Sequence, residues 1–306
     1  MKQLLFIGST VADVVVRIPF LPRTGEDLHV SAQHTSLGGC ACNAFLAARR
    51  AGQAACTLFS PVGSGVWGDW VQGALEKRGI RTPIPRVQTP SGCCYCLVED
   101  DGERTFLSHH GAEYLFEAAW FDAINLRDYA GVYLCGLEVE EATGDVVISA
   151  LESEAPRRLY FAPGPRICRI RPEKLARVMA LHPVLHLNAA EAAAFTGTEE
   201  LARAAGLLHD ITDNDVVITL GEQGALVLDG IGCRVIPGVP AQVVDTIGAG
   251  DAHIGTIMAA EADGLPLGEA VQLANRVSAA VVSTAGAELP QEKWTEVLDS
   301  WRMARS

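Results

Sequence analysis

Residues 245–251 read Asp245-Thr246-Ile247-Gly248-Ala249-Gly250-Asp251, and an apolar stretch with helical periodicity follows from Ile254 to Ala262. Glycines permit a sharp turn into a helix start, where free backbone N–H groups and the helix dipole favour an anion. An aspartate at such a start can accept a proton from a nearby hydroxyl group, although it can also simply cap the helix. The segment therefore predicts an anion-binding turn, formed by Gly248, Ala249 and Gly250, with Asp251 as candidate base.

Short apolar runs alternate with helical patterns along the rest of the chain, as expected for strands buried on both faces of a parallel sheet. The predicted strands are Leu4–Ile7, Val132–Leu134, Leu159–Phe161, Val184–Leu187 and Val216–Thr219. The predicted helices are Asn43–Ala51, Asp69–Arg78, Thr143–Ser153, Pro172–Ala180 and Ala190–Phe195, and the chain from Gly248 onward is expected to be helical. This alternation indicates an α/β fold with a doubly wound, mostly parallel sheet flanked by helices.

Two segments, residues 13–36 and 92–109, break this alternation. Both contain β-prone, partly alternating residues, and the second carries the turn signal Asp100-Asp101-Gly102. We therefore expect a single domain over residues 1–306, with two β inserts that form a small lid over a ligand cleft. Because the edges of such a lid are open to pairing, a homodimer through the lid is a further prediction.

Composition narrows the classes of partner. The chain has 306 residues, of which 49% are hydrophobic and 20% charged, as in globular proteins. A net charge of -13 without a long Lys/Arg run argues against nucleic-acid binding. Neither a secretion signal nor a membrane-spanning run is present, so we expect a cytoplasmic protein without a membrane partner.

The nine cysteines are expected to be reduced thiols in such a chain. Cys40-x-Cys42 and Cys93-Cys94-x-Cys96 lack the paired spacing of zinc sites, so packed side chains are the preferred interpretation. The chain also lacks the sequence motifs of two nucleotide-binding classes of protein. Gly8-Ser9-Thr10-Val11 replaces the glycine fingerprint of nicotinamide dehydrogenases, and the chain contains no P-loop.

Asn188 and Glu191 follow a predicted strand and lie three residues apart, so on a new helix they would share one face. Their oxygen atoms suit Mg²⁺, but the same pair is an ordinary helix-capping arrangement. Glu138 follows another predicted strand, at the sheet edge where open α/β sheets bind ligands.

Together the motifs resemble those of the ribokinase-like (PfkB) carbohydrate kinases, over nearly the whole chain. The segment Asp245–Asp251 looks like the C-terminal signature of that family, and Gly38-Gly39 with Asn43 resembles its N-terminal signature. Asp13 stands where the family places a carboxylate that binds sugar hydroxyls. Asn188-Ala-Ala-Glu191 is similar to the motif that organises Mg²⁺ and phosphates, Thr219–Gly224 resembles the nucleotide-binding turn, and Asn275 falls beside the expected adenine.

The resemblance implies an ATP-dependent kinase that phosphorylates a hydroxyl group of a small sugar, with Mg²⁺ as cofactor and Asp251 as general base. The expected substrate-binding residues are Asp13, Gly38, Gly39, Asn43, Glu138 and Arg104. The expected nucleotide-binding residues are Asn188, Thr219, Gly221, Gly224 and Asn275. Glu191 is the expected Mg²⁺ residue, through water. Asp245, with the backbone near Ile247, Val282 and Ala287, resembles the monovalent-cation site of many members, which makes K⁺ a candidate activator.

Some positions depart from the family pattern. Cys40-Ala41-Cys42-Asn43 replaces the ribokinase-type Lys-Gly-Ala-Asn, which counts against ribose as substrate. His253 replaces a usual aromatic residue and is expected to be a core histidine with a local partner. Arg104 and His109-His110 end the second insert, where they could meet a charged or ring-shaped substrate. A nucleoside kinase of the same fold and a non-catalytic sugar or nucleotide sensor therefore stay as alternatives.

Overall fold

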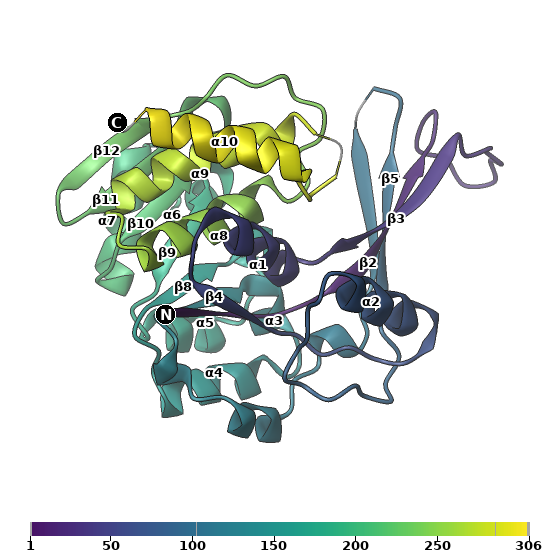
Figure 1. The fold of residues 1–306 in the computed structure, drawn as a ribbon, viewed down its shortest axis with the longest axis horizontal. Coiled ribbons are helices and arrows are strands. Elements are labelled where there is room, and N and C mark those ends of the chain that lie inside the picture. The colour runs from purple at the N-terminus through teal and green to yellow at the C-terminus, as the bar shows by residue number, and fades with distance from the viewer. Residues whose placement is uncertain (1, 102, 285, 305–306) are drawn as a thin grey trace.

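The computed structural model describes residues 2–101, 103–284 and 286–304, which form a large sheet, a small sheet and flanking helices (Figure 1). Gly102, part of the predicted turn signal, lies outside the described residues. The large sheet has eight strands in the order β12-β11-β10-β9-β8-β7-β1-β4. From β10 to β4 all neighbours run parallel, whereas β11 and β12 form an antiparallel extension. The predicted mostly parallel α/β fold is confirmed.

The central strands of the large sheet are apolar on both faces, whereas the edge strand β12 alternates between half-buried and exposed residues. Their bounds are β1 Gln3–Ile7, β4 Ala55–Phe59, β7 Gly131–Cys135, β8 Leu159–Ala162, β9 Val184–Asn188, β10 Val216–Thr219, β11 Gly224–Asp229 and β12 Gly232–Pro237. In β1, Leu4 and Phe6 belong to one hydrophobic core, while Leu5 and Ile7 belong to another. Because side chains alternate along a strand, the sheet separates two cores, and both must be covered by helices.

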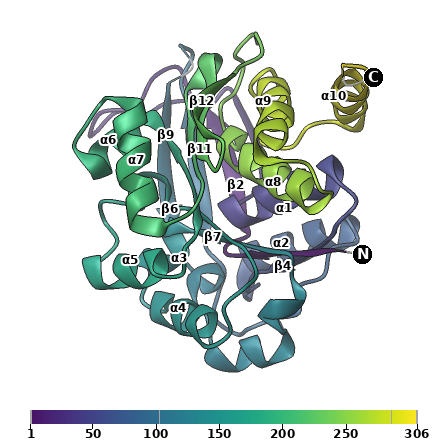
Figure 2. The same cartoon turned by 90° about the vertical axis from the view of Figure 1, so that its left-hand side faces the viewer.

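Helices cover both faces (Figure 2). One layer contains α1 Cys40–Ala51, α8 Ala249–Ala262, α9 Leu267–Val282 and α10 Gln291–Met303. The other contains α3 Gly136–Glu140, α4 Gly144–Ser153, α5 Pro172–Met179, α6 Ala189–Thr196 and α7 Leu201–Thr212. The five helices predicted upstream of residue 248 are found within four residues of their expected bounds, the second of them as α2 Gly65–Lys77. No described helix combines the length and apolar character needed to cross a membrane.

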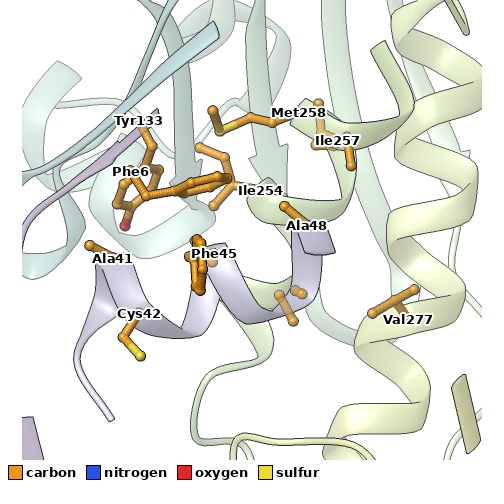
Figure 3. Packing of buried hydrophobic residues seen from close by; sticks show 14 of the residues in the cluster. Phe6, Ala41, Cys42, Phe45, Ala48, Tyr133, Ile254, Ile257, Met258 and Val277 are labelled. Atoms are coloured by element: carbon orange, nitrogen blue, oxygen red, sulfur yellow. The ribbon is translucent and has the colours of Figure 1, made fainter. Parts of the chain in front are cut away.

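Close packing of α1 against α8 positions the site described below. Figure 3 shows Phe45 of α1 beside Phe6 of the sheet and Ile254 of α8 in one buried cluster. A Cβ on Gly255 would lie only 2.1 Å from the carbonyl oxygen of Ala44, so the two helices touch through their backbones. This contact brings the first turns of two helices that are distant in sequence to the same edge of the large sheet.

The small sheet joins two hairpins in the order β3-β2-β5-β6. Its strands are β2 Val11–Arg17, β3 Ala32–Gly38, β5 Cys93–Val98 and β6 Arg104–His109. The central strands β2 and β5 run parallel, with Asp13 opposite Cys94. The sheet projects from the body of the molecule in Figure 1. Its action as a lid, and its pairing in a homodimer, stay predictions.

Candidate active site

The glycine turn ends in the first turn of α8. Gly248 has φ 73°, a left-handed conformation that favours glycine, and a Cβ there would lie 2.6 Å from the Cβ of Ala287. The N–H of Ala249 donates to the carbonyl of Thr246 at 3.4 Å, and the next N–H of α8 with a partner one turn back is that of Ala252, which donates to the carbonyl of Gly248 at 2.8 Å. The N–H groups of Gly250 and Asp251 precede it, so they belong to the unpaired first turn of a helix. Such N–H groups can receive an anion.

Asp251 is held by donors from α1. Asn43 Nδ2 donates to Asp251 Oδ2 at 3.0 Å, and the thiol of Cys40 also bonds to this carboxylate. Burial raises the pKa of Asp251 to about 6, while the hydrogen bonds from Asn43 and Cys40 lower it against that effect. The carboxylate is therefore largely ionised at neutral pH, yet more basic than an ordinary aspartate. These are the properties of a general base.

Asp13 lies against Gly38, the first of the two glycines that precede α1. A Cβ on Gly38 would lie 1.8 Å from Asp13 Oδ2, and a Cβ on Gly39 would lie 2.5 Å from the carbonyl oxygen of Ser9. Gly39 also has φ 97°, so both steric and backbone reasons require glycine there. Burial, together with smaller contributions from the nearby Cys94 and Asp251, raises the pKa of Asp13 to about 7.

Two cavities meet at the glycine turn. The first cavity, of about 470 Å³, is lined by residues that include Asp251, Cys40 and Ser108. The second cavity, of about 380 Å³, lies beyond the turn and is lined by residues that include Gly221 and Gly224. Thr219 and Gly250 line both cavities. Molecules bound in the two cavities would therefore face each other next to Asp251.

The second cavity is shaped by the turn between β10 and β11. Gly221 has φ 60° and Gly224 has φ 97°, and a Cβ on Gly224 would lie 2.1 Å from the carbonyl oxygen of Ile236. Asn275, on α9, donates from Nδ2 to the carbonyl oxygens of Ile236 at 3.1 Å and Pro237 at 3.0 Å. Its side chain therefore fixes the end of β12 and forms part of the cavity wall.

A chain of neutral polar side chains connects the two cavities beneath the glycine turn. Because Asn275 Nδ2 donates to two carbonyls, its Oδ1 accepts from His253 Nε2 at 3.0 Å. His253 Nδ1 then accepts from His186 Nε2 at 2.8 Å. Burial lowers the pKa of His253 to about 4 and that of His186 well below its usual range. The prediction that His253 is a core histidine with a local partner is confirmed.

Asn188 and Glu191 form a capping box at the start of α6. The Glu191 N–H donates to Asn188 Oδ1 at 2.8 Å, and the Asn188 N–H donates to Glu191 Oε2 at 3.0 Å. Both residues also line the first cavity, together with Asp251. The capping alternative is thus present in the structure, and it leaves oxygen atoms of this pair beside the cavity.

Arg104 ties the small sheet to the glycine turn. Arg104 Nη1 lies 3.0 Å from Asp245 Oδ1 and donates to Thr246 Oγ1 at 3.1 Å. Asp245 also accepts the N–H of Ile247 on Oδ1 at 2.8 Å and that of Gly286 on Oδ2 at 2.9 Å. Both Asp245 oxygens therefore have donors, and a guanidinium supplies the positive charge next to this carboxylate.

Glu138 and His110 have different surroundings. Glu138 is fully buried and accepts the N–H of Ser9 on Oε1 at 2.8 Å, and burial raises its pKa to about 7. His110 lines the first cavity, where its ring lies 4.2 Å from that of Tyr114, and its Nδ1 lies 2.6 Å from Glu141 Oε1. The first cavity thus has an aromatic wall, whereas Glu138 lies behind its walls.

Sequence reasoning missed three residues of this site. Cys40 could have been found from its position, because it replaces the lysine of the ribokinase-type motif at the helix start. Tyr114 lies in a short 3₁₀ helix, and its sequence gives no signal for the cavity. His186 interrupts an otherwise apolar predicted strand, which is a signal for a buried polar partner.

Comparison with known proteins identifies the family to which the chain belongs. The model of the pfkB family carbohydrate kinases matches residues 1–294. An uncharacterized sugar kinase of Escherichia coli strain K12 is 33% identical over 291 residues, which is 94% of this chain and 90% of that protein.

Two solved structures share the fold. Arabidopsis thaliana ribokinase complexed with ribose and ATP superposes with a TM-score of 0.77 at 19% identity, covering 97% of this chain and 98% of that one. The nucleoside kinase of Burkholderia thailandensis in complex with inosine gives 0.79 at 20% identity, covering 99% and 97%. The chain therefore belongs to the pfkB family of carbohydrate kinases, phosphotransferases that act on an alcohol group.

Proposed function

We propose that this enzyme transfers the γ-phosphoryl group of ATP to a hydroxyl group of a small sugar or sugar derivative, with Asp251 as general base. The observation that carries the proposal is the meeting of two cavities at Gly250, directly before Asp251. An acceptor in the first cavity and a nucleotide in the second would have their reacting groups at the same carboxylate. Such positioning supplies much of the rate enhancement in phosphoryl transfer.

The proposed acceptor-binding residues are Asp13, Gly38, Gly39 and Asn43. None of them is among the residues that line the first cavity, and Asn43 is connected to it through its hydrogen bond to Asp251. Asn43 holds Oδ2 of Asp251, so the carboxylate keeps one orientation while it accepts the proton of the attacking hydroxyl. Asp13 would accept hydrogen bonds from further hydroxyl groups of a polyol. Because Gly38 has no side chain, the Asp13 carboxylate can occupy this position against the backbone.

The Gly248–Gly250 turn is the proposed anion hole. The unpaired N–H groups of Gly250 and Asp251 and the dipole of α8 favour negative charge at this helix start. The charge that builds on the transferred phosphoryl group would lie there, between the two cavities. Preorganised donors of this kind stabilise a transition state without reorganising during the reaction.

The residues around the cavities fit MgATP. The proposed nucleotide-binding residues are Thr219, Gly221, Gly224 and Asn275, and the two glycines place no side chain of their own in the cavity. Asn188 and Glu191 offer oxygen atoms, which Mg²⁺ prefers, and their capping box favours contact through water. When bound, Mg²⁺ neutralises phosphate charge.

A monovalent cation does not fit Asp245 in this arrangement. Both oxygens of Asp245 already have donors, and Arg104 provides the compensating charge. No step of the reaction is therefore assigned to K⁺.

The test is ATP consumption with Mg²⁺ against monosaccharides, sugar acids, sugar phosphates and nucleosides, in parallel with Asp251→Asn. Asp210→Asn, an exposed aspartate on α7, is the matched control. We expect turnover on one acceptor class, retained in the control and lost in Asp251→Asn. Full turnover by Asp251→Asn would refute the role of this carboxylate, and ATP binding without turnover on any class would favour a sensor.

One observation favours a nucleoside as the acceptor. His110 and Tyr114 form a ring pair in the wall of the first cavity, which also contains Leu137, Pro163 and Pro165. Flat aromatic walls suit stacking of a base. If the acceptor is a nucleoside, His110→Ala should raise the KM for nucleosides more than tenfold and leave the KM for free sugars unchanged. Equal changes in both KM values would exclude base stacking at His110.

A further inference from the structure

Three potential metal ligands share one face of the small sheet, next to the active site. Asp13 on β2 stands directly opposite Cys94 on β5, because the two strands pair in parallel at this register. Cys96 follows two residues later on β5, so its side chain is on the same face as that of Cys94. The register thus gathers two thiols and a carboxylate from two separate segments of the chain.

The spacing of the ligand atoms suits a tetrahedral ion. Cys94 Sγ and Cys96 Sγ lie 3.9 Å apart, and one oxygen of Asp13 lies within 4.8 Å of both sulfurs. Two thiolates at ~2.3 Å from a tetrahedral Zn²⁺ would lie ~3.8 Å apart. The sulfurs are therefore already at the required separation, and only a small movement of the Asp13 side chain is needed.

We propose that Asp13, Cys94 and Cys96 form a binding site for a thiophilic divalent cation, represented by Zn²⁺. The sequence argued against a metal because the cysteines lack paired C-x-x-C spacing. That objection does not apply here, since the third ligand comes from another strand. Two sulfurs select against Mg²⁺ and Ca²⁺, which require oxygen ligands, so the site is distinct from that of the nucleotide's metal.

The surroundings support a site with one open position. Cys96 is 1% exposed, whereas Cys94 and Asp13 are half-buried, so an ion enters past Asp13 and Cys94. Ser108 donates from Oγ to Cys94 Sγ at 3.4 Å and also lines the first cavity. Its hydroxyl orients the first sulfur, and water from the cavity completes the coordination. On binding, the two thiols, and the Asp13 carboxyl where it is protonated, release their protons to solvent, and the ion exchanges water ligands for two Zn–S bonds and one Zn–O bond.

The consequence for activity rests on the proposed function. If Asp13 binds acceptor hydroxyls, an ion on its carboxylate excludes the acceptor. The metal would then act as a competitive inhibitor with respect to the acceptor, and the acceptor would protect the thiols. The existence of the metal site does not depend on this second step.

Co²⁺ is the probe for a direct test, because thiolate ligation gives a sulfur-to-metal absorption band and tetrahedral visible transitions. We expect the full-length reduced protein to bind one Co²⁺ with this band, and one equivalent of Zn²⁺ to abolish it. Cys94→Ser and Cys96→Ala should each remove the band, with folding checked by circular dichroism. Cys168→Ser and Cys233→Ser, at exposed cysteines, should retain it. Asp13→Asn should weaken Co²⁺ binding at least tenfold.

A band that survives in Cys94→Ser, or that disappears in Cys168→Ser or Cys233→Ser, would overturn the proposal. Absence of any band in a protein that is active as a kinase would overturn it as well and leave the proposed function intact. Co²⁺ affinity that does not change with saturating acceptor would support the metal site and refute acceptor binding by Asp13. The two proposals can therefore fail separately.

Discussion

The two aspartates at the ends of the glycine turn, Asp245 and Asp251, belong to one segment but have opposite surroundings. Asp245 faces the guanidinium of Arg104 and accepts two backbone N–H groups. Asp251 is half-buried, and its partners Asn43 and Cys40 are uncharged. The charge of the Asp245 carboxylate is balanced by Arg104, and this carboxylate fixes the shape of the turn. The Asp251 carboxylate has no cationic partner and keeps a raised pKa. The comparison shows how a single loop separates a structural role from a proposed chemical one.

The largest expected effect is on turnover. Asp251→Asn preserves size and the hydrogen bond from Asn43 but removes the base, so kcat should fall on the order of 10² to 10⁴ fold. Asp245→Asn should lower kcat far less, because this substitution alters only the hydrogen bonds that anchor the turn. Steady-state kinetics at pH 8, with the acceptor class that the proposed panel assay selects, measures both. If the two variants lose equal activity, the contrast between the two aspartates does not hold.

The substitutions Asp251→Asn and Asp245→Asn should change the free energy of unfolding in opposite directions. Burial raises the folded pKa of Asp251 from 3.8 to about 6, so its ionised form destabilises the fold above pH 6. Asp251→Asn should therefore increase the free energy of unfolding at pH 8 by about 3 kcal/mol, with the gain shrinking as pH falls toward 4.

Asp245→Asn should instead lower the free energy of unfolding at pH 8 by about 1–3 kcal/mol, because donors including Arg104 lose an ionised partner. Urea unfolding at pH 8 and at pH 5 distinguishes the two cases. A stability loss in Asp251→Asn at pH 8 would show that its carboxylate is not strained by burial.

A smaller effect is expected from pH alone. Since the base must be ionised, kcat/KM should fall about tenfold per pH unit below pH 6, because burial raises the pKa of Asp251 in the free enzyme to about 6. Asn43 lowers this pKa through its hydrogen bond, so Asn43→Ala should move the acidic limb to higher pH. A profile that is flat between pH 5 and pH 7 would assign the base to another group.

The smallest expected effect concerns K⁺. In the wild type, activity should change less than about twofold between K⁺ and a bulky organic cation, because Arg104 already balances Asp245. Arg104→Met should uncover the carboxylate and make activity depend several-fold on K⁺. Strong K⁺ activation of the wild type would mean that Arg104 leaves Asp245 during turnover.

Much of the fold could be predicted because it depends on local patterns. The strand Val216–Thr219 is apolar on both faces and has the expected bounds, as β10. By contrast, β12 alternates between half-buried and exposed residues at the edge of the sheet, and its sequence gives no comparable signal. Periodicity reveals buried elements well and edge elements poorly.

The site is harder to predict where it depends on the relative placement of distant elements. Asp251 and the glycines before it could be predicted because they form one short contiguous motif. Asn188 and Glu191 of the capping box could be predicted from their spacing of three residues. Arg104 was expected to contact the substrate, but its contact with Asp245 depends on how the small sheet sits against the turn. The position of Asp13 opposite Cys94 depends on strand register, which the sequence of neither strand specifies alone.

The position of Asp13 against Gly38 also makes Asp13 sensitive to any change at position 38. The carboxylate oxygen occupies the place where any side chain at position 38 would begin, 1.8 Å from an added Cβ. A larger residue at position 38 would therefore displace the Asp13 carboxylate from its present position. A substitution at position 38 would thus change the proposed acceptor contact of Asp13 even though the mutated residue itself carries no polar group there.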